Sequence, residues 1–269
     1  MPGVYLQQRY FPIKPRKLYS IQEQPPAEGL VLDSLRLYFD MGNPNSYPGS
    51  GTTWNDIADV IPDATAQVIQ STSEISYDSA NGGSWAFNPT SDTGQVSNIG
   101  FVIGQPYTVS DPTITFSFWV KVGTALTTGA TLIGYSVNET PAVAGRLQIK
   151  INTNYSIEVV KAAIASSGVF PGSQSKLTPG VITNIVVTKA GTLYKLYING
   201  EYVSEFTSSN TYNVGSSCLG QSYNPGAPFS FRAIEKFKGN MYVFMVYDAA
   251  LTAAQVLQNY NVQKGRYGL

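Results

Sequence analysis

The sequence predicts an all-β fold, a two-sheet antiparallel sandwich with a short C-terminal helix and an extended N-terminal arm. Many short segments alternate apolar and polar residues, and Gly, Pro, Asn and Ser separate them at short intervals. Only one segment, near the C-terminus, has helical periodicity with end caps. Several short strands between frequent turn signals are typical of a sandwich.

The chain has 269 residues, a length that permits one large all-β domain or two small ones. Apolar residues make up 43 % of it, which excludes a disordered chain. We expect an arm over residues 1–29 and one domain over residues 30–269.

The first 29 residues combine prolines, which fix extended backbone, with aromatic and basic side chains. A solvated linker rarely carries so many aromatic rings, so the segment is predicted to dock on a partner. The alternative is an irregular segment packed on the domain's own core. The candidate docking residues are Tyr5, Arg9, Tyr10, Phe11, Lys14, Arg16, Lys17 and Tyr19.

The clearest strand is Thr113–Val122, where every even position is apolar and the odd positions are mostly polar, with Trp119 the exception. Asn199-Gly200 is the strongest hairpin signal, because Asn-Gly favours a type I′ turn. The other predicted strands are Leu35–Asp40, Thr131–Tyr135, Arg146–Asn152, Ser156–Lys161, Ile182–Lys189, Leu193–Ile198, Glu201–Phe206 and Met241–Tyr247.

The predicted helix begins after Thr252, with Gln255 completing a capping box. Gly265 is expected to close its C-terminal end. Its predicted apolar face consists of Val256, Leu257 and Tyr260.

The chain contains no histidine and one cysteine. Ser-His-Asp and Cys-His catalysis and imidazole metal ligands are therefore excluded. Cys218 has no partner for an internal disulfide and is expected to be a small buried filler. No signal peptide and no membrane span are visible. We therefore expect a protein made in a cytoplasm, with no membrane partner.

The net charge is zero, from 17 basic and 17 acidic residues, but the charges are not spread evenly. Residues 1–22 hold four bases and no acid, whereas residues 23–111 hold eleven acids and one base. This asymmetry favours docking of basic termini on an acidic neighbouring surface. No dense basic patch exists, so no nucleic-acid partner is expected.

Distinctive motifs are spread along the chain: Leu35–Asp40 with Asn43-Pro44-Asn45-Ser46-Tyr47-Pro48-Gly49, Thr53-Trp54-Asn55-Asp56, Phe116–Val122, Leu193–Gly200, Phe237-Lys238-Gly239-Asn240 and Tyr247-Asp248-Ala249-Ala250-Leu251-Thr252. In this order, they resemble the concanavalin A-like lectin/glucanase superfamily, and more narrowly the laminin-G-like jelly-roll domains of tailed-bacteriophage virion proteins. The resemblance covers about residues 30–265 and is most specific at the C-terminal block.

The resemblance implies a jelly roll that binds carbohydrate or protein on its concave face or rim loops. Some members hydrolyse glucans through a Glu-x-Asp-x-x-Glu strand, which this sequence lacks. Glu201 and Glu205 are the closest pair of acidic residues in the sequence that could share one face of a strand. We expect both side chains to be solvated rather than catalytic. We therefore expect no enzyme activity.

A structural calcium ion is the one cofactor that the resemblance leaves open. Tyr242 stands where the family's calcium-binding acid would be expected. Asp40, Asn43 and Asn45 offer alternative oxygen ligands. The favoured interpretation is an Asx-rich turn whose side chains bond their own backbone, and we expect no cofactor.

Aromatic side chains in rim loops are the candidate glycan contacts. Tyr47 and Trp54 are assigned to such loops, although Trp54 has the alternative role of plugging one end of the sandwich. Tyr223 and Asn224 form a second candidate loop. Phe116, Phe118 and Trp119 are expected to belong mostly to the core.

Three functions follow from this resemblance. The first is a non-enzymatic bacteriophage virion protein, a capsid decoration or cement component or a tail accessory, which docks through its arm. The second is a lectin-like adhesin for host surface glycans, and the third, disfavoured, is a glucan hydrolase. The predicted location is the virion, and the candidate partners are other virion proteins, a second copy of the chain and host surface glycan.

Overall fold

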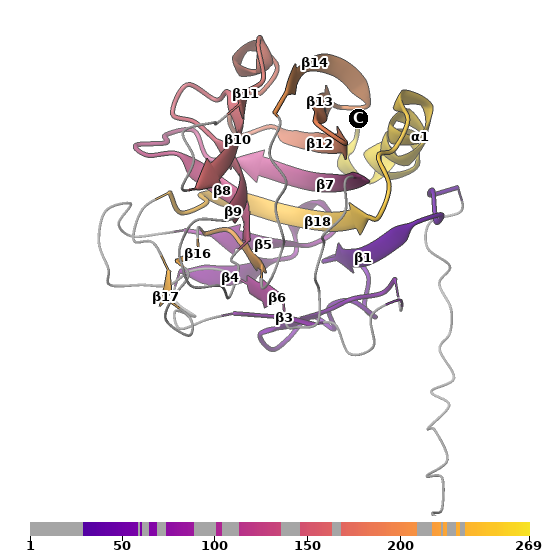
Figure 1. Ribbon diagram of the computed structural model, residues 1–269. Coiled ribbons are helices and arrows are strands. Elements are labelled where there is room, and N and C mark those ends of the chain that lie inside the picture. The colour runs from indigo at the N-terminus through magenta and orange to yellow at the C-terminus, as the bar shows by residue number, and fades with distance from the viewer. Residues whose placement is uncertain are drawn as a thin grey trace, which may run out of the picture.

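The computed structural model describes residues 29–58, 60, 65–68, 74–88, 101–103, 113–135, 146–162, 168–208, 217–221, 223–224, 230–231 and 235–269. These residues form two eight-stranded sheets that face each other, with a helix outside the first sheet (Figure 1). The predicted all-β sandwich is confirmed. The candidate docking residues of the arm, Tyr5 to Tyr19, lie outside the described residues.

Both sheets are antiparallel throughout their described pairings. The first sheet has the order β14 (Glu201–Thr207), β13 (Leu193–Ile198), β12 (Ile182–Ala190), β7 (Thr113–Val122), β18 (Gly239–Tyr247), β5 (Ser84–Phe87) and β4 (Ile75–Asp78), and β1 (Leu35–Asp40) also pairs with β18. The second has the order β11 (Gly168–Val169), β10 (Ile157–Ala162), β9 (Arg146–Ile151), β8 (Ala130–Tyr135), β15 (Ser217–Leu219), β6 (Phe101–Ile103), β3 (Thr65–Val68) and β2 (Thr53–Asn55). A separate two-stranded ribbon pairs β16 (Tyr223–Asn224) with β17 (Ser230–Phe231).

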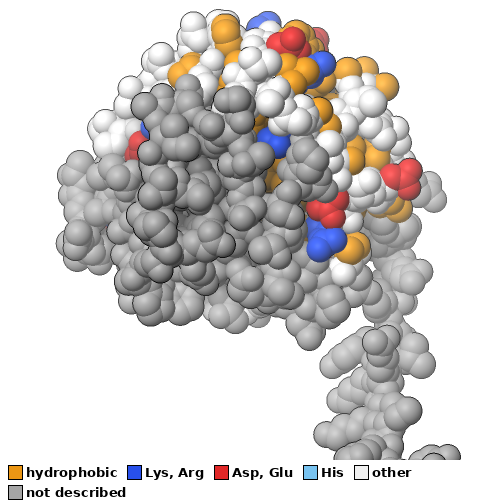
Figure 2. Space-filling model, viewed as in Figure 1, with side chains coloured by type: hydrophobic (Ala, Val, Ile, Leu, Met, Phe, Trp, Pro, Cys, Tyr) orange, Lys and Arg blue, Asp and Glu red, His pale blue; other side chains and the backbone are white. Residues whose placement is uncertain are grey.

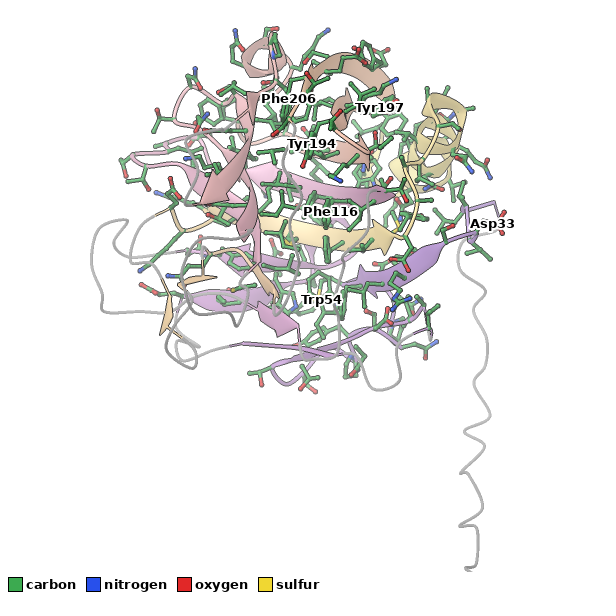
Figure 3. All side chains as sticks on the ribbon, viewed as in Figure 1. Asp33, Trp54, Phe116, Tyr194, Tyr197 and Phe206 are labelled. Carbon is green, nitrogen blue, oxygen red and sulfur yellow. The ribbon has the colours of Figure 1, made fainter. Side chains whose placement is uncertain are left out.

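The main core lies between the two sheets and is built on aromatic rings. Phe118 stacks on Phe244 with ring centroids 5.1 Å apart, and Phe39 stacks on the other side of Phe244 at 6.4 Å. Phe116 and Trp54 project into the same space (Figure 3). Each fully buried phenylalanine stabilises the fold by about 2 kcal/mol, so this layer holds the sheets together.

Trp119 belongs to a second core on the outer face of the first sheet, where helix α1 (Ala253–Lys264) covers β7 and β18. Its ring stacks on Tyr260 of the helix at 5.6 Å, and its Nε1 donates a hydrogen bond to Gln263 Oε1 at 2.7 Å. Strand β7 is therefore buried on both faces, which explains why its alternation fails at Trp119.

The helix begins and ends at the predicted residues, but the backbone at its C-terminal end is not left-handed. Thr252 and Gln255 form the expected capping box. The predicted apolar face is wrong at Leu257, which is 44 % exposed, because Val256, Asn259 and Gln263 face the sheet instead. Gly265 follows the last helical residue but has right-handed backbone, and the chain continues as a 3-10 turn, η3 (Gly265–Tyr267), before it turns left-handed at Gly268.

The other local predictions agree closely with the structure. Every strand that the sequence predicts is present, with bounds that differ by at most two residues. Asn199 and Gly200 both have positive φ angles, 53° and 80°, as a type I′ hairpin requires. Cys218 is fully buried in β15, and burial raises the pKa of its thiol, as expected for an inert filler.

The described part of the fold begins beside helix α1. Gln258 Nε2 donates to the carbonyl of Gly29 at 2.6 Å, and the amide of Val31 donates to Asn259 Oδ1 at 2.8 Å. These bonds fix the point at which residues 1–28 join the described fold. Within the described ranges, no helix has the length and hydropathy to cross a membrane. The described surface in Figure 2 is mainly neutral, and its charged side chains are scattered.

Candidate binding surface at one end of the sandwich

A tight hairpin joins β4 to β5 at one end of the first sheet. Asp78 pairs with Ser84 across it, and the 3-10 turn η1 (Ala80–Gly82) lies between them. Asp78 Oδ1 accepts the amide hydrogen of Ala80 at 2.9 Å, and Asn81, Gly82 and Gly83 all have positive φ angles. The turn therefore places Tyr77 one residue before the hairpin loop.

Tyr77 is a partly exposed ring supported by buried rings. It is 37 % exposed, and its centroid lies 5.0 Å from that of Tyr47 and 6.5 Å from that of Trp85. Tyr47 in turn lies 4.8 Å from Trp85 and donates its hydroxyl to the carbonyl of Gly51 at 2.9 Å. Burial, and secondarily the nearby Tyr77, raise the pKa of Tyr47. The Tyr77 ring is thus held in place from beneath.

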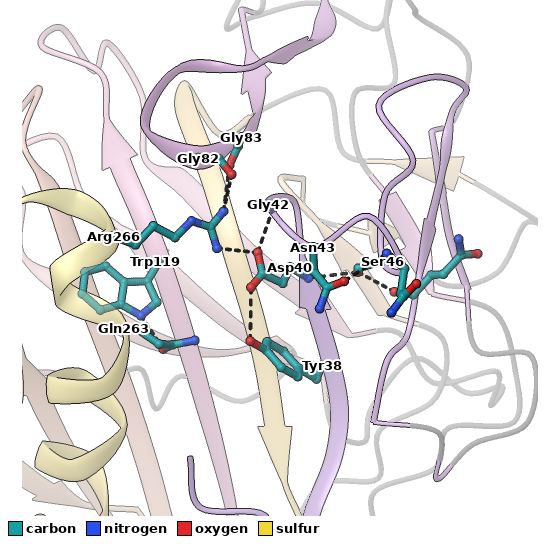
Figure 4. A network of polar contacts seen from close by, with 12 residues as sticks. Tyr38, Asp40, Gly42, Asn43, Ser46, Gly82, Gly83, Trp119, Gln263 and Arg266 are labelled. Carbon is teal, nitrogen blue, oxygen red and sulfur yellow. Dashed lines mark hydrogen bonds and ion pairs between the residues drawn. The ribbon is translucent and has the colours of Figure 1, made fainter. Parts of the chain in front are cut away.

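Arg266 of η3 forms hydrogen bonds both to the hairpin loop and to Asp40 at the end of β1 (Figure 4). Its Nη1 donates to Asp40 Oδ1 at 2.5 Å, and its Nη2 donates to the carbonyls of Gly82 and Gly83 at 2.5 and 3.4 Å. A Cβ at Gly42 would collide with the guanidinium, so only glycine leaves room for this side chain there.

Asp40 has further partners that complete this network. Its carboxylate accepts hydrogen bonds from the amide of Gly42 at 2.8 Å and the hydroxyl of Tyr38 at 3.1 Å. Ser46 Oγ accepts the Asp40 amide at 3.0 Å. Burial, followed by the charge of Asp40, raises the pKa of Tyr38 far above its usual range. The turn after β1 is therefore fixed at both of its ends.

The Gly82–Gly83 loop contacts both the Tyr77 side chain and the Arg266 network. Gly83 accepts from Arg266, and a Cβ at Gly83 would lie 3.0 Å from the Tyr77 hydroxyl. The turn after β1 also joins them, because it contacts Arg266 at Gly42 and carries Tyr47 beneath Tyr77. We call this region the end surface, and define it by Asn43, Asn45, Tyr77, Asn81 and Arg266.

Two of the predicted glycan contacts are corrected by their burial. Trp54 is not in a loop but at the centre of β2, fully buried, with its ring 5.3 Å from that of Phe39. Tyr47 is 4 % exposed. A sugar does not reach the face of either ring in this structure, and both rings pack in the core.

The other predicted contacts, Tyr223 and Asn224, form strand β16. Their side chains lie outside the described part of the structure.

The candidate calcium ligands are already engaged by other groups. Asp40 is paired with the Arg266 cation, and Asn43 Oδ1 accepts the amide of Asn45 at 3.0 Å as an Asx turn does. The described residues contain no group of three or more His, Cys, Asp or Glu side chains placed to hold a metal ion. These three residues therefore do not fit a calcium site built on Asp40.

Glu201 and Glu205 are not arranged as a catalytic pair. Glu201 is exposed beside the hairpin turn, and Glu205 forms an exposed ion pair with Lys195 at 3.7 Å. On the second sheet, Glu235 and Glu158 both contact Lys150, at 2.8 and 3.6 Å.

Tyr77 and Arg266 were not among the residues predicted from the sequence. A local signal for Tyr77 exists, since Ile75-Ser76-Tyr77-Asp78 alternates directly before Asn81-Gly82-Gly83. No local signal marks Arg266, because its carboxylate partner is 226 residues away in the sequence.

Several solved structures share this architecture. A Trypanosoma rangeli sialidase in complex with sialic acid matches with a TM-score of 0.58 and 16 % identity, over 87 % of this chain and 33 % of the sialidase. The binding domain of botulinum neurotoxin DC in complex with SialylT matches with a TM-score of 0.61 and 14 % identity, over 87 % of this chain and 52 % of that one. The ligand-binding domain of botulinum neurotoxin serotype D, in complex with N-acetylneuraminic acid, matches with a TM-score of 0.59 and 14 % identity, over 86 % of this chain and 51 % of that one.

These likenesses show a shared fold. The present chain spans a third of the sialidase and about half of the toxin domains. A search of curated proteins found no match. The laminin G-like family model described as the concanavalin A-like lectin/glucanases superfamily matches residues 97–257, more than half of the chain. This protein therefore belongs to the concanavalin A-like lectin/glucanase superfamily.

Proposed function

We propose that this domain is a non-enzymatic glycan-binding module and that the end surface is its binding site. The observation that carries the proposal is the Tyr77 ring, which is partly exposed to solvent while Tyr47 and Trp85 hold it from beneath. The apolar face of a sugar packs well on an aromatic ring, and a tyrosine adds a hydroxyl for hydrogen bonding. A ring that is already fixed loses little conformational entropy on binding.

The neighbouring groups suit the polar edge of a sugar. The side chains of Asn45, in the turn after β1, and Asn81, in the β4–β5 hairpin loop, are exposed and supply both donors and acceptors. The Arg266 network holds the Asn81-Gly82-Gly83 loop in position. The superfamily includes lectins, and solved structures with this fold hold sialic acid and related ligands, which supports a glycan as the ligand class.

The non-enzymatic part of the proposal is supported by the described carboxylates. Glycoside hydrolysis needs two carboxyl groups on either side of one sugar bond, about 5–9.5 Å apart. Glu205 is paired with Lys195, and Glu158 and Glu235 share Lys150. Incubation with β-glucans should therefore release no reducing sugar.

Glycan-array binding by the wild-type chain and a Tyr77→Ala variant tests the assignment. We expect the wild type to bind, and the variant to lose at least about tenfold in affinity, since removing a stacking ring costs more than about 1.4 kcal/mol. Tyr202→Ala is the matched control: Tyr202 is 52 % exposed on β14, and its loss should leave binding unchanged.

Two results would contradict the assignment. Unchanged binding by a folded Tyr77→Ala chain would exclude the end surface as the site. Failure of the wild type to bind any glycan on the array would exclude the glycan-binding function itself. Urea unfolding of both variants shows whether each remains folded.

We propose further that the chain serves in a bacteriophage particle, as a capsid decoration or cement component or a tail accessory. The supporting observations are the basic residues 1–22 and the fixed junction at Gly29 and Val31, where helix α1 holds the start of the domain. A deletion of residues 1–28 is expected to leave a folded domain that no longer joins particles. Normal incorporation of the shortened chain would overturn this role, without bearing on glycan binding.

A further inference from the structure

Strand β14 forms an exposed edge of the first sheet (Figure 1). It stands first in the strand order, and among the described strands only β13 pairs with it. Glu201, Tyr202, Glu205 and Thr207 are exposed along it, and Tyr202 is 52 % exposed. The free side of an edge strand offers a row of amide and carbonyl groups to a further strand.

The register between β13 and β14 shows which backbone groups point outward. The amide of Ser208 donates to the carbonyl of Thr192 at 2.8 Å, so these two residues form a hydrogen-bonded pair. Bonded and non-bonded pairs alternate along an antiparallel ladder, which makes Phe206 the next bonded residue of β14. Glu205 and Thr207 therefore direct their amide and carbonyl groups away from β13, toward the free side.

The charges of this edge favour a basic partner. Strands β13 and β14 together hold one base, Lys195, and two acids, Glu201 and Glu205. Pairing of β14 with β14 of a second copy about a two-fold axis would bring the glutamates of both copies together, and like charges across a strand pair are destabilising. An extended segment with basic side chains fits the edge without this repulsion.

Residues 16–24 have the composition of such a segment. They read Arg-Lys-Leu-Tyr-Ser-Ile-Gln-Glu-Gln and contain no proline, which would remove a donor from the ladder. Arg16 and Lys17 supply positive charge at the first end of the segment. Tyr19 and Ile21 are residue types enriched in strands.

The junction with the described fold sets the reach and direction of this segment. Gly29 is bound to helix α1 at Gln258, and the β13–β14 turn packs on the same helix, where a Cβ at Gly200 would lie 3.0 Å from Leu257. The chain between the segment and Gly29 reaches about 16 Å, more than the helix diameter of about 10–12 Å. A segment that crosses α1 from Gly29 meets β14 at its turn end and runs antiparallel to it.

We infer that residues 16–24 add to the first sheet as an antiparallel strand beside β14 of the same chain. The outward amide and carbonyl groups of Glu205 and Thr207 then gain partners, and Arg16 and Lys17 lie toward the Glu205 end of the strand. The short tether gives the segment an effective concentration of about millimolar at this edge, which favours its own chain over a second copy. The inference is independent of glycan binding, because β14 is not part of the end surface, and it leaves residues 1–15 for contact with a partner.

Amide hydrogen exchange of the full-length chain, read by NMR at Glu205 and Thr207, tests this pairing. We expect both amides to be protected in the wild type. Neighbouring residues of a strand face opposite sides, so one of Ser20→Pro and Ile21→Pro must break the ladder and should raise both exchange rates at least about tenfold. Gln8→Pro is the matched control and should leave the rates unchanged.

The outcomes identify the occupant of the edge. Exchange of both amides at the rate of an unstructured peptide in the wild type would overturn the inference, as would protection that both proline variants retain. Protection that disappears on dilution would assign the edge to a second copy instead. Loss of protection in Gln8→Pro would contradict the assignment to residues 16–24. Exchange at the amides bonded between β12 and β13 shows whether each variant remains folded.

Discussion

At the scale of single residues, Arg266 links three segments that are far apart in the sequence. Its guanidinium contacts Asp40 after β1 and the Gly82–Gly83 loop before β5, while η3 carries it next to helix α1. Loss of a partly buried ion pair with backbone acceptors lowers the free energy of unfolding more than loss of an exposed pair. Removal of Arg266 would leave the Asp40 carboxylate without its cation.

Replacement of Arg266 should therefore destabilise the domain. We expect Arg266→Ala to lower the free energy of unfolding by about 2 kcal/mol, through lost charged hydrogen bonds and an uncompensated Asp40. Lys195→Ala removes the cation of an exposed pair and should cost less than about 0.5 kcal/mol. Urea unfolding measures both values, and equal losses in the two variants would refute a special role for Arg266.

The sequence predicted the residues of this region better than it predicted their partners. An Asx-rich turn after Asp40 was the favoured interpretation, and the Asn43–Asn45 bond confirms it. The burial of Tyr47 and Trp54 was missed, because loop composition does not show which rings a distant strand will cover. The ion pair of Asp40 with Arg266 was also missed, since a contact between residues 226 positions apart leaves no local pattern in the sequence.

At the scale of elements, strands were predictable because apolar alternation reports directly on burial of one face. The pattern gives no partner strand, so the order of strands in each sheet came only from the structure. Trp119 marks a second limit. It occupies a position of β7 where the alternation predicts a polar residue, because helix α1 covers the outer face of the sheet there. The helix residue that it contacts, Gln263, is 144 residues away in the sequence.

Helix α1 should depend on its capping box more than on its apolar content, because only Val256 of its apolar residues is fully buried. Removal of the Thr252 hydroxyl leaves the amide of Gln255 without its capping acceptor. We expect Thr252→Ala to cost about 1 kcal/mol and Thr252→Ser to cost much less. Thermal unfolding followed by circular dichroism compares them, and equal destabilisation by alanine and serine would argue against the cap.

At the scale of the whole molecule, the sandwich and its family were predictable because the motifs are spread along the chain. The end surface was not, since it forms where the turn after β1, the β4–β5 hairpin and the C-terminal η3 meet. Its polar contacts and ring contacts are consequences of tertiary packing. Composition nevertheless has one global consequence, which concerns the response of the fold to pH.

The domain should be insensitive to pH near neutrality and should lose stability in alkali. The chain has no histidine, so no imidazole titrates between about pH 5 and 8. Burial is the main cause that raises the pKa values of Tyr38, Tyr247 and Tyr267 well above the ordinary value of 10.0. A raised folded-state pKa leaves stability intact below the unfolded pKa. Above that value only the unfolded chain releases these protons, and stability falls.

Three such phenols would together cost about 4 kcal/mol by pH 11, at about 1.4 kcal/mol each. Urea unfolding from pH 6 to 11 should show a plateau followed by a fall above about pH 10. Phenolate absorbance should show the buried tyrosines ionising only as the fold is lost. If they ionise near pH 10 while circular dichroism still reports the folded domain, the burial of these hydroxyls is contradicted, and with it the packing of β1, β18 and η3 against helix α1.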